Sequence, residues 1–375
     1  MSAPSLALQS RQGQLDFFLE QVCFALQLTE AQYEDARSKY EAVGKWLSGP
    51  GSPLSQFQPV IFPQGSMRIG TTNRPWVGDE FDLDLVCRLH GCGTAHPNAV
   101  YEAVYARLAN NGLYRPILEK KNRCIRLNYA GDFHLDIIPA CPDTFRGEPF
   151  IKVPDREMAV WKTSNPVGFA EIFFECCKRQ IVSGTEALAK SIQPLPSAVP
   201  SQYKYVLQHI VQLMKRHRDR FFDGDNDAAR SIVLTTLAQT FYRGEQSLQD
   251  GLEGILNGIF SAIETCHGIL QVPNPSNPQE KFSDAWTSES YADFVAYIRN
   301  FRLQLDRLIR ANGLGSASEA LGHLFGERVA SKAISAFGTG TEQLRKENNL
   351  RITKAGALTT ASSGIGIRPN NFYGR

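Results

Sequence analysis

Residues 80–86 read Glu80-Phe81-Asp82-Leu83-Asp84-Leu85-Val86, and they lie between Gln64-Gly65-Ser66 and His134-Leu135-Asp136-Ile137-Ile138-Pro139. Within 81–89, apolar side chains occupy every second position, which predicts a half-buried strand. Asp82 and Asp84 therefore share one face, roughly 6.5 Å apart along the strand. The segment 133–138 repeats the pattern, so Asp136 can join them from a neighbouring strand. Three carboxylates on one face repel one another unless a cation neutralises them, which favours a divalent metal site.

The turn before this strand has the composition of a phosphate-binding loop. Gly65 and Ser66 follow a short apolar run that Pro63 ends. They are predicted to open a short helix whose free N–H groups favour a polyphosphate. Each feature alone has a simpler explanation, because an Asp-x-Asp pair is common on solvated strands and Gly-Ser is common in ordinary turns. Their order in one chain favours the functional interpretation.

This combination resembles the nucleotidyltransferase superfamily that includes DNA polymerase beta, oligoadenylate synthase and cyclic GMP-AMP synthase. Within it, the chain is most similar to the bacterial cGAS/DncV-like nucleotidyltransferases, or CD-NTases, of anti-phage signalling. The narrower resemblance is carried by Gln64-Gly65-Ser66-Met67-Arg68-Ile69-Gly70-Thr71, by the strand 80–86, by Asp136-Ile137-Ile138-Pro139-Ala140 and by the Pro-Asn-Pro-Ser-Asn-Pro turn at 273–278 that leads to Trp286. It spans most of residues 15–310.

The resemblance implies an α+β fold, with a polymerase-beta-like core facing a helical lobe across a cleft. It implies that Asp82, Asp84 and Asp136 are catalytic and bind two Mg²⁺ or Mn²⁺ ions. It also implies a nucleotide site that comprises Gln64, Gly65, Ser66, Lys215 and Ser231. The expected activity joins nucleoside triphosphates (ATP, GTP or others) into a cyclic oligonucleotide, which acts as a second messenger for a downstream effector in anti-phage defence.

Lys215 and Ser231 each have a plain alternative. Lys215 lies in a run with Arg216, Arg218 and Arg220, which is also the pattern of an exposed basic stripe. Ser231 begins a predicted helix and can act simply as its N-cap. His209 and His217 are expected to have packing roles.

Composition is that of a cytoplasmic enzyme. The 375 residues are 42% hydrophobic and 21% charged, which suits about two domains with large cores. A net charge of +2 gives no support to the capture of long nucleic acids. No apolar run has the length of a membrane span or the form of a signal peptide.

The eight cysteines show no regular spacing and lie mostly in apolar segments, as free thiols do in a reducing compartment. We therefore expect no disulfide framework. His90, Cys92 and His96 form a cluster that hints at zinc, but it lacks a fourth ligand, so a structural role is expected.

The chain is predicted to have three parts. Residues 1–155 form N-terminal helices and the catalytic core, 156–337 form the helical lobe, and 338–375 form a flexible tail. Thr29 and Gln32 have the spacing of a capping box that opens a long helix. Further strands are expected near 59–63 and 123–129, and further helices near 97–111, 169–179, 203–220, 228–242, 246–268 and 288–311.

The tail is rich in small residues but ends with the aromatic pair Phe372 and Tyr373, which suggests docking. The resemblance implies a regulatory or conjugating protein partner there, although Arg375 departs from that pattern and simple disorder is the alternative. Two other functions compatible with the acid triad are a template-independent RNA polymerase and a protein-modifying nucleotidyltransferase. A catalytically idle binding module is the remaining alternative.

Overall fold

The computed structural model describes residues 10–75, 80–129, 133–178, 195, 201–223, 229–354, 358–362 and 364–367. The chain divides into two compact units. The sheet unit comprises Leu28–Pro200 and Gln271–Ala285, and the helical unit comprises Met1–Gln27, Ser201–Leu270 and Trp286–Arg375. The units therefore interleave along the chain, in contrast to the linear division expected at 155, because contacts rather than chain order define a compact unit.

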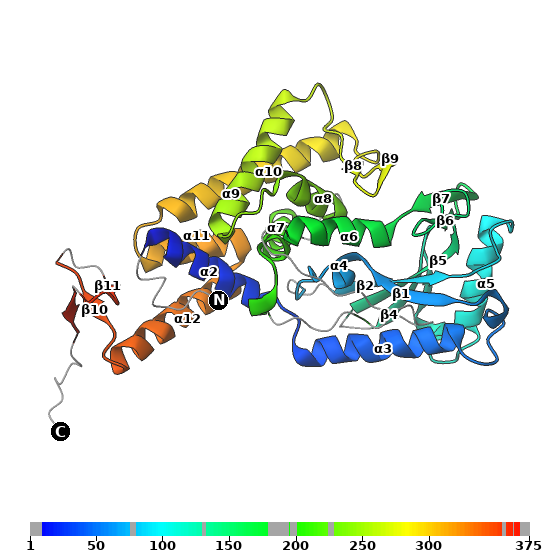
Figure 1. The fold of residues 1–375 in the computed structure, drawn as a ribbon, viewed down its shortest axis with the longest axis horizontal. Helices are drawn as coiled ribbons and strands as arrows, with labels where there is room; N and C mark the ends of the chain where they lie inside the picture. The colour runs from blue at the N-terminus through cyan, green and yellow to red at the C-terminus, as the bar shows by residue number, and fades with distance from the viewer. Residues whose placement is uncertain are drawn as a thin grey trace. The chain divides into compact units, whose positions relative to one another are not determined.

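The sheet unit is built around a mixed sheet of seven strands (Figure 1). The strands are β1 (Val60–Gln64), β2 (Phe81–Arg88), β3 (Leu118–Lys120), β4 (Ile125–Tyr129), β5 (Phe133–Pro142), β6 (Ile151–Asp155) and β7 (Val160–Ser164). The central order is β1-β2-β5-β4-β3, and β6 and β7 extend the sheet from the end of β5. Strands β2 and β5 run parallel, whereas the other pairs are antiparallel.

Helices α3 (Glu30–Ser48) and α5 (Pro97–Ala109) pack against the sheet and against each other (Figure 1). The predicted capping box of Thr29 and Gln32 is present at the start of α3. Apolar residues at helical spacing on α3 are fully buried with those of β2 and β5, including Tyr40, Leu83 and Leu135. The alternation expected for β2 is confirmed, because its Phe81, Leu83 and Leu85 side chains enter this core while Asp82 is exposed.

On the opposite face of β2 and β5, the side chains change from acidic to apolar along the strands. Beyond the acidic residues, Val86 and Ile138 form a small buried cluster that Val167 of α6 (Pro166–Cys177) covers. The hairpin of β8 (Pro273–Asn274) and β9 (Asn277–Lys281) is fixed to the start of α6, because Ser276 Oγ donates a hydrogen bond of 3.0 Å to the carbonyl oxygen of Asn165. The acidic residues on this face therefore lie in the first half of each strand.

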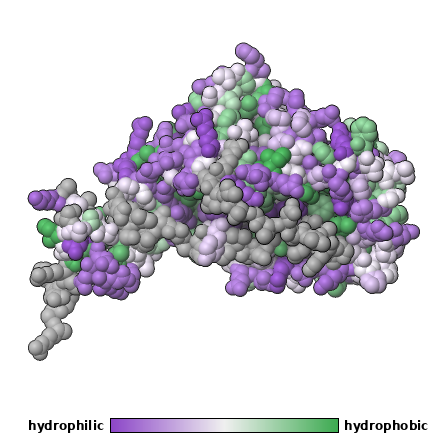
Figure 2. All heavy atoms as spheres, in the orientation of Figure 1, coloured by the Kyte–Doolittle hydropathy of each residue, from purple (hydrophilic) through white to green (hydrophobic). Residues whose placement is uncertain are grey.

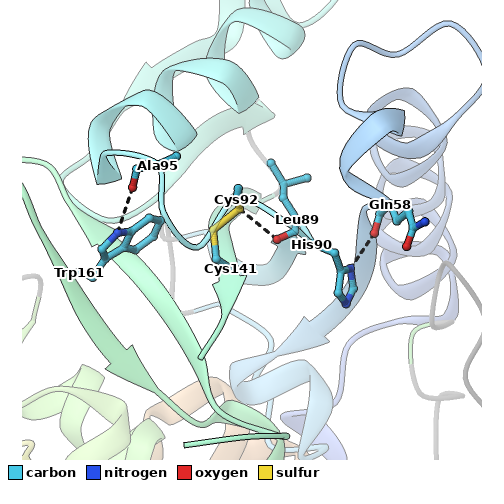
Figure 3. The surroundings of a disulfide bond; sticks show 7 residues. All are labelled: Gln58, Leu89, His90, Cys92, Ala95, Cys141 and Trp161. Atoms are coloured by element: carbon cyan, nitrogen blue, oxygen red, sulfur yellow. Dashed lines mark hydrogen bonds between the residues drawn. A yellow bond between two sulfur atoms is a disulfide. The ribbon is translucent and has the colours of Figure 1, made fainter. Parts of the chain in front are cut away.

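A disulfide bond links Cys92, after β2, to Cys141 at the end of β5 (Figure 3). The expectation that these two cysteines are free thiols is wrong. They lie 49 residues apart in sequence but come together because β2 and β5 are parallel neighbours in register up to Arg88 and Ala140. The other six cysteines are outside this disulfide, and four of them are buried, namely Cys23, Cys87, Cys176 and Cys177.

Replacement of both Cys92 and Cys141 by alanine is expected to lower the free energy of unfolding by roughly 4 kcal/mol, because the crosslink closes a loop of about 50 residues. Urea unfolding with and without dithiothreitol measures this. The wild-type protein should lose stability on reduction, and the double variant should not respond. Cys266→Ala, at a free and half-buried thiol, is the control and should retain the response. An unchanged wild-type midpoint after complete reduction would contradict the crosslink.

The helical unit contains α2 (Arg11–Ala25), α7 (Val206–Phe222), α8 (Ser231–Phe241), α9 (Leu248–Thr265), α10 (Ser288–Arg310), α11 (Leu314–Phe325) and α12 (Glu327–Lys346). Its core includes two histidines on α7. His217 is 1% exposed, stacks on Phe301, and its Nδ1 lies 3.0 Å from the carbonyl oxygen of Leu324. His209 is 8% exposed, and its Nε2 lies 3.1 Å from Ser201 Oγ. Both have the packing role expected from the sequence.

The two histidines make stability depend on pH. Burial lowers the pKa of both His209 and His217 to about 4, whereas an unfolded histidine titrates near 6.5. The two neutral histidines contribute fully to the free energy of unfolding above about pH 6.5. This contribution is lost as pH falls towards 4, because the unfolded chain binds protons at a higher pH than the folded chain does. We expect a loss of about 3 kcal/mol for each histidine. Urea midpoints between pH 4 and pH 7 measure it.

The matched variants for this measurement are His217→Gln and His323→Gln. His217→Gln should flatten the acid slope, whatever its stability at pH 7. His323 is half-exposed on α11, so His323→Gln should keep the wild-type slope. Equal slopes for all three proteins would rule out His217 as a source of the acid sensitivity.

The structure differs from the flexible tail expected from residue 338. Helix α12 continues to Lys346, and three short strands follow, β10 (Arg351–Ile352), β11 (Leu358–Thr359) and β12 (Ile365–Gly366). Strand β10 pairs with both β11 and β12. Leu350, which is 4% exposed, anchors this segment, because its N–H donates to the carbonyl oxygen of Leu344. Phe372 and Tyr373 lie outside the described residues.

Hydrophilic side chains predominate on the face of the protein drawn in Figure 2, and hydrophobic residues form scattered patches between them. Among the helices in the described part of the chain, none combines the length and the apolar character that crossing a membrane requires.

Candidate active site

Four polar residues form one row across the sheet. The strand registers place Gln64 of β1 opposite Asp84 of β2, Asp84 opposite Asp136 of β5, and Asp136 opposite Arg126 of β4. Asp82 is one pleat away, on the same face as Asp84 and opposite His134. The parallel pairing of β2 with β5 therefore makes the three candidate acids neighbours.

The acids differ in their surroundings. The Asp82 side chain is 61% exposed, whereas that of Asp136 is 11% exposed. Both carboxylate oxygens of Asp136 accept hydrogen bonds from Arg126, at 2.7 Å from Nε and 2.8 Å from Nη2. These bonds raise the pKa of Arg126, and Arg126 Nη2 also lies 3.5 Å from Asp82 Oδ1. The guanidinium therefore neutralises part of the acidic charge.

Cys124 also contacts the third acid. Burial raises the pKa of the Cys124 thiol, and its hydrogen bond to Asp136 raises it further. The thiol therefore stays protonated and donates to the carboxylate. Glu80 and His134 form a second polar pair at this end of the sheet, with 2.9 Å between His134 Nδ1 and Glu80 Oε2.

The Gly65-Ser66 turn lies directly against the acids. Gly65 has a φ of +63°, and a Cβ atom added there would overlap Asp84 Oδ2. The turn continues into α4 (Gly65–Arg68), and Ser66 Oγ lies 3.0 Å from Thr72 Oγ1. The Thr71 N–H donates to the carbonyl oxygen of Ser66 at 2.9 Å. This packing fixes the turn beside Asp84, where only glycine leaves room for the carboxylate.

The donor set suits a hard divalent cation. Carboxylate oxygens are the ligands that Mg²⁺ and Mn²⁺ prefer, and the Gly65 turn leaves space for the Asp84 carboxylate. In the described part of the chain, no three acidic, histidine or cysteine side chains converge in a geometry ready for a metal. Both oxygens of Asp136 are instead hydrogen-bonded to Arg126.

Sequence reasoning missed Arg126, Cys124 and Thr72. Arg126 had a usable signal, since it is a charged residue within a predicted strand next to the strand of the third acid. Nothing in the sequence distinguishes Cys124 or Thr72, because their role depends on which segments become neighbours.

Lys215 and Ser231 belong to the helical unit. Lys215 and Arg216 are 8% and 3% exposed on α7, so the exposed basic stripe considered as an alternative is wrong for both. Ser231 is the first residue of α8, after an N-cap at Arg230, and its Oγ accepts a hydrogen bond of 2.7 Å from Arg218.

The three residues of the zinc-like cluster have separate structural roles. Cys92 is in the disulfide, and His90 Nδ1 lies 2.9 Å from the carbonyl oxygen of Gln58 (Figure 3). His96 is the N-cap of α5, where its side chain accepts from the Asn98 N–H.

Comparison with known proteins connects this site to a family. Residues 14–176 match the family described as the Second Messenger Oligonucleotide or Dinucleotide Synthetase domain. The chain is 32% identical over 381 residues to a c-di-GMP synthase of Roseivirga ehrenbergii, which covers 98% of this chain and all of that protein. The chain belongs to the CD-NTase family. This CD-NTase is accordingly a nucleotidyltransferase.

Two further similarities agree. The CD-NTase is 29% identical to the cyclic dinucleotide synthase CdnG of Bradyrhizobium diazoefficiens, over 92% of this chain and 88% of that protein. The structure of CdnG in complex with GTP superposes with a TM-score of 0.70, at 25% identity, over 87% of this chain and 99% of that chain. The Vibrio cholerae DncV apo form shares the fold, with a TM-score of 0.59 over 88% of this chain and 97% of that chain, at 16% identity. The predicted polymerase-beta-like α+β fold is confirmed.

Proposed function

We propose that this CD-NTase joins two GTP molecules into cyclic di-GMP and releases pyrophosphate. The observation that carries the proposal is the full-length similarity to a protein named c-di-GMP synthase. The GTP complex of CdnG supports the same nucleotide. The sequence alone left ATP, GTP and other triphosphates open.

The candidate site residues of the sheet unit have two different proposed roles, metal binding and phosphate positioning. Asp82, Asp84 and Asp136 would hold two Mg²⁺ or Mn²⁺ ions. Bound there, the metal would neutralise the triphosphate and lower the pKa of the acceptor hydroxyl. The Gly65-Ser66 turn and Gln64 would position the donor phosphates beside Asp84, since phosphoryl transfer depends mainly on alignment and charge neutralisation. In the helical unit, Lys215 and Ser231 would contact the triphosphate.

The partners follow from the product. The cyclic dinucleotide would act as a second messenger on a downstream effector in anti-phage defence in the cytoplasm. A regulatory or conjugating protein at the C-terminal tail is a further proposal, supported by the aromatic pair of Phe372 and Tyr373.

The test is incubation of the purified enzyme and Mg²⁺ with each nucleoside triphosphate alone and with all four together. Mass spectrometry should find cyclic di-GMP, resistant to phosphatase, with GTP alone, and a reaction with excess EDTA is the control. A mixed-base product from the four triphosphates would overturn the choice of GTP. Extension of an added RNA, or transfer of label to protein, with no cyclic product would support the alternative functions.

A further inference from the structure

Arg126 lies where a metal ion is expected to bind. It is directly opposite Asp136 in the β4–β5 register, and the row continues through Asp84 to Gln64. The guanidinium makes two hydrogen bonds of 2.7 and 2.8 Å to Asp136 and lies 3.5 Å from Asp82. It therefore contacts two of the three candidate metal ligands, on neighbouring positions of one sheet face.

The bidentate geometry sets up a competition. A fork of two parallel N–H bonds uses a lone pair on each carboxylate oxygen in the plane of the carboxylate. A cation held by Asp136 would need an oxygen of the same carboxylate. The Asp136 side chain is 11% exposed, which leaves little space for both partners, whereas the Arg126 side chain is 22% exposed on a flexible stem. The arginine is therefore the partner that can move.

The charge arrangement gives the arginine a role when no metal is present. Asp82, Asp84 and Asp136 on adjacent pleats repel one another in the folded protein. Arginine supplies a positive charge that never titrates in a protein. Its other neighbours include Glu119, opposite it on β3, and the thiol of Cys124.

We propose that Arg126 is the resident counter-cation of the acid triad, which holds Asp136 while the site contains no metal and must be displaced when a divalent ion binds. The proposal rests on the metal-binding role assigned above to the three acids. It makes Arg126 a positioning residue that keeps the site closed to divalent ions until their binding is strong enough to break its pair with Asp136.

An arginine that competes with the metal and an arginine that orients a metal ligand predict opposite changes in metal affinity when the arginine is replaced. If Arg126 merely oriented Asp136 towards the metal, its loss would weaken metal binding. If it competes, its loss strengthens binding, because the ion no longer has to break the ion pair. The metal-free protein should at the same time become less stable, since the acids lose their counter-charge.

The experiment is a titration of the nucleotide-free enzyme with Mn²⁺, followed by electron paramagnetic resonance, together with thermal unfolding at zero and saturating Mn²⁺. Arg126→Gln should bind Mn²⁺ about tenfold more tightly than wild type. Without metal, the thermal unfolding midpoint of Arg126→Gln should be lower than that of wild type. The difference between the two midpoints should become smaller at saturating Mn²⁺. Arg126→Lys keeps the positive charge but not the bidentate hydrogen bonds, so its Mn²⁺ affinity should be intermediate. It is the variant to measure if Arg126→Gln does not fold.

Arg123→Gln is the matched control. Arg123 also pairs with a buried carboxylate, at 3.2 Å from Asp155, but away from the acid row. It should leave Mn²⁺ affinity unchanged. If both Arg126 variants bind Mn²⁺ with the same affinity as wild type or more weakly, and Asp84→Asn still abolishes binding, the competition is wrong. The metal-binding role of the triad then stands. Mn²⁺ binding that Asp84→Asn does not affect overturns the metal-binding role of the triad, and the competition with it.

Discussion

Asp84→Asn is expected to lower the rate of cyclic product formation at least a hundredfold while the protein stays folded. Asp84 is central in the row, with Gln64 on one side and Asp136 on the other. The amide removes a full negative charge from the set that would hold the metal, and losses of this kind cost about a hundred- to a thousandfold in rate. Pyrophosphate release and mass spectrometry of the product measure it.

Stability should respond in the opposite sense to activity. Removal of one of three neighbouring carboxylates relieves repulsion, so the free energy of unfolding should change by less than about 1 kcal/mol. Asp35→Asn is the control, because Asp35 is on the surface of α3 and pairs with Lys39. It should keep wild-type activity. A folded Asp84→Asn protein with more than half of the wild-type rate would remove this residue from the catalytic set.

Asp84 is a cleaner test than Asp136. Asparagine at 136 would also leave Arg126 without its bidentate partner, so a loss of activity would combine two effects. Asp84 does not pair with Arg126 across the strands, and its replacement changes the acid row without releasing the guanidinium.

The strands of the site could be predicted from the sequence because their pattern is local. Alternation over 81–89 and 133–138 identified both strands and put Asp82 and Asp84 on one face, as the structure has them. The capping box of α3 was equally local and is confirmed. Such features depend only on residues within a few positions of each other, so a single sequence contains them.

The pairing of strands could not be predicted in the same way. The parallel register of β2 with β5 joins segments about fifty residues apart, and it brings Asp84 beside Asp136 and Cys92 beside Cys141. The alternation allowed Asp136 to join from a neighbouring strand, but it does not specify the register or the direction of the pairing. Arg126 is different, because it lies only ten residues before Asp136 on the preceding strand, so it had a local signal that the sequence reasoning did not use.

The burial of Lys215 and the order in the tail also depend on contacts between residues far apart in the sequence. Lys215 has basic neighbours in sequence, which left an exposed stripe open as an alternative, but the packing of α7 in the helical core buries it. In the tail, the small residues indicated flexibility, yet the buried Leu350 and the pairing of β10 with β11 and β12 order part of it. Tertiary contacts override local composition in both cases.

Gly65→Ala is expected to reduce product formation at least about a hundredfold and to lower the free energy of unfolding by about 1–3 kcal/mol. Two effects combine at this position. The φ of +63° is unfavourable for any residue with a Cβ atom, and that atom would overlap Asp84 Oδ2. Either the turn or the carboxylate must move, and both belong to the proposed site. Steady-state rates and urea unfolding of the purified variant measure the two effects.

Gly51→Ala separates backbone strain from the clash. Gly51 has a φ of +79° in the loop after α3, but a Cβ atom added there meets nothing within 4 Å. Its replacement should cost about 1 kcal/mol of stability, as strain alone does, and leave activity at the wild-type level. The difference in activity between the two variants then reports the contact of Gly65 with Asp84. If both variants lost activity equally, strain or general destabilisation would explain the loss, and the turn would have no special relation to the acid row.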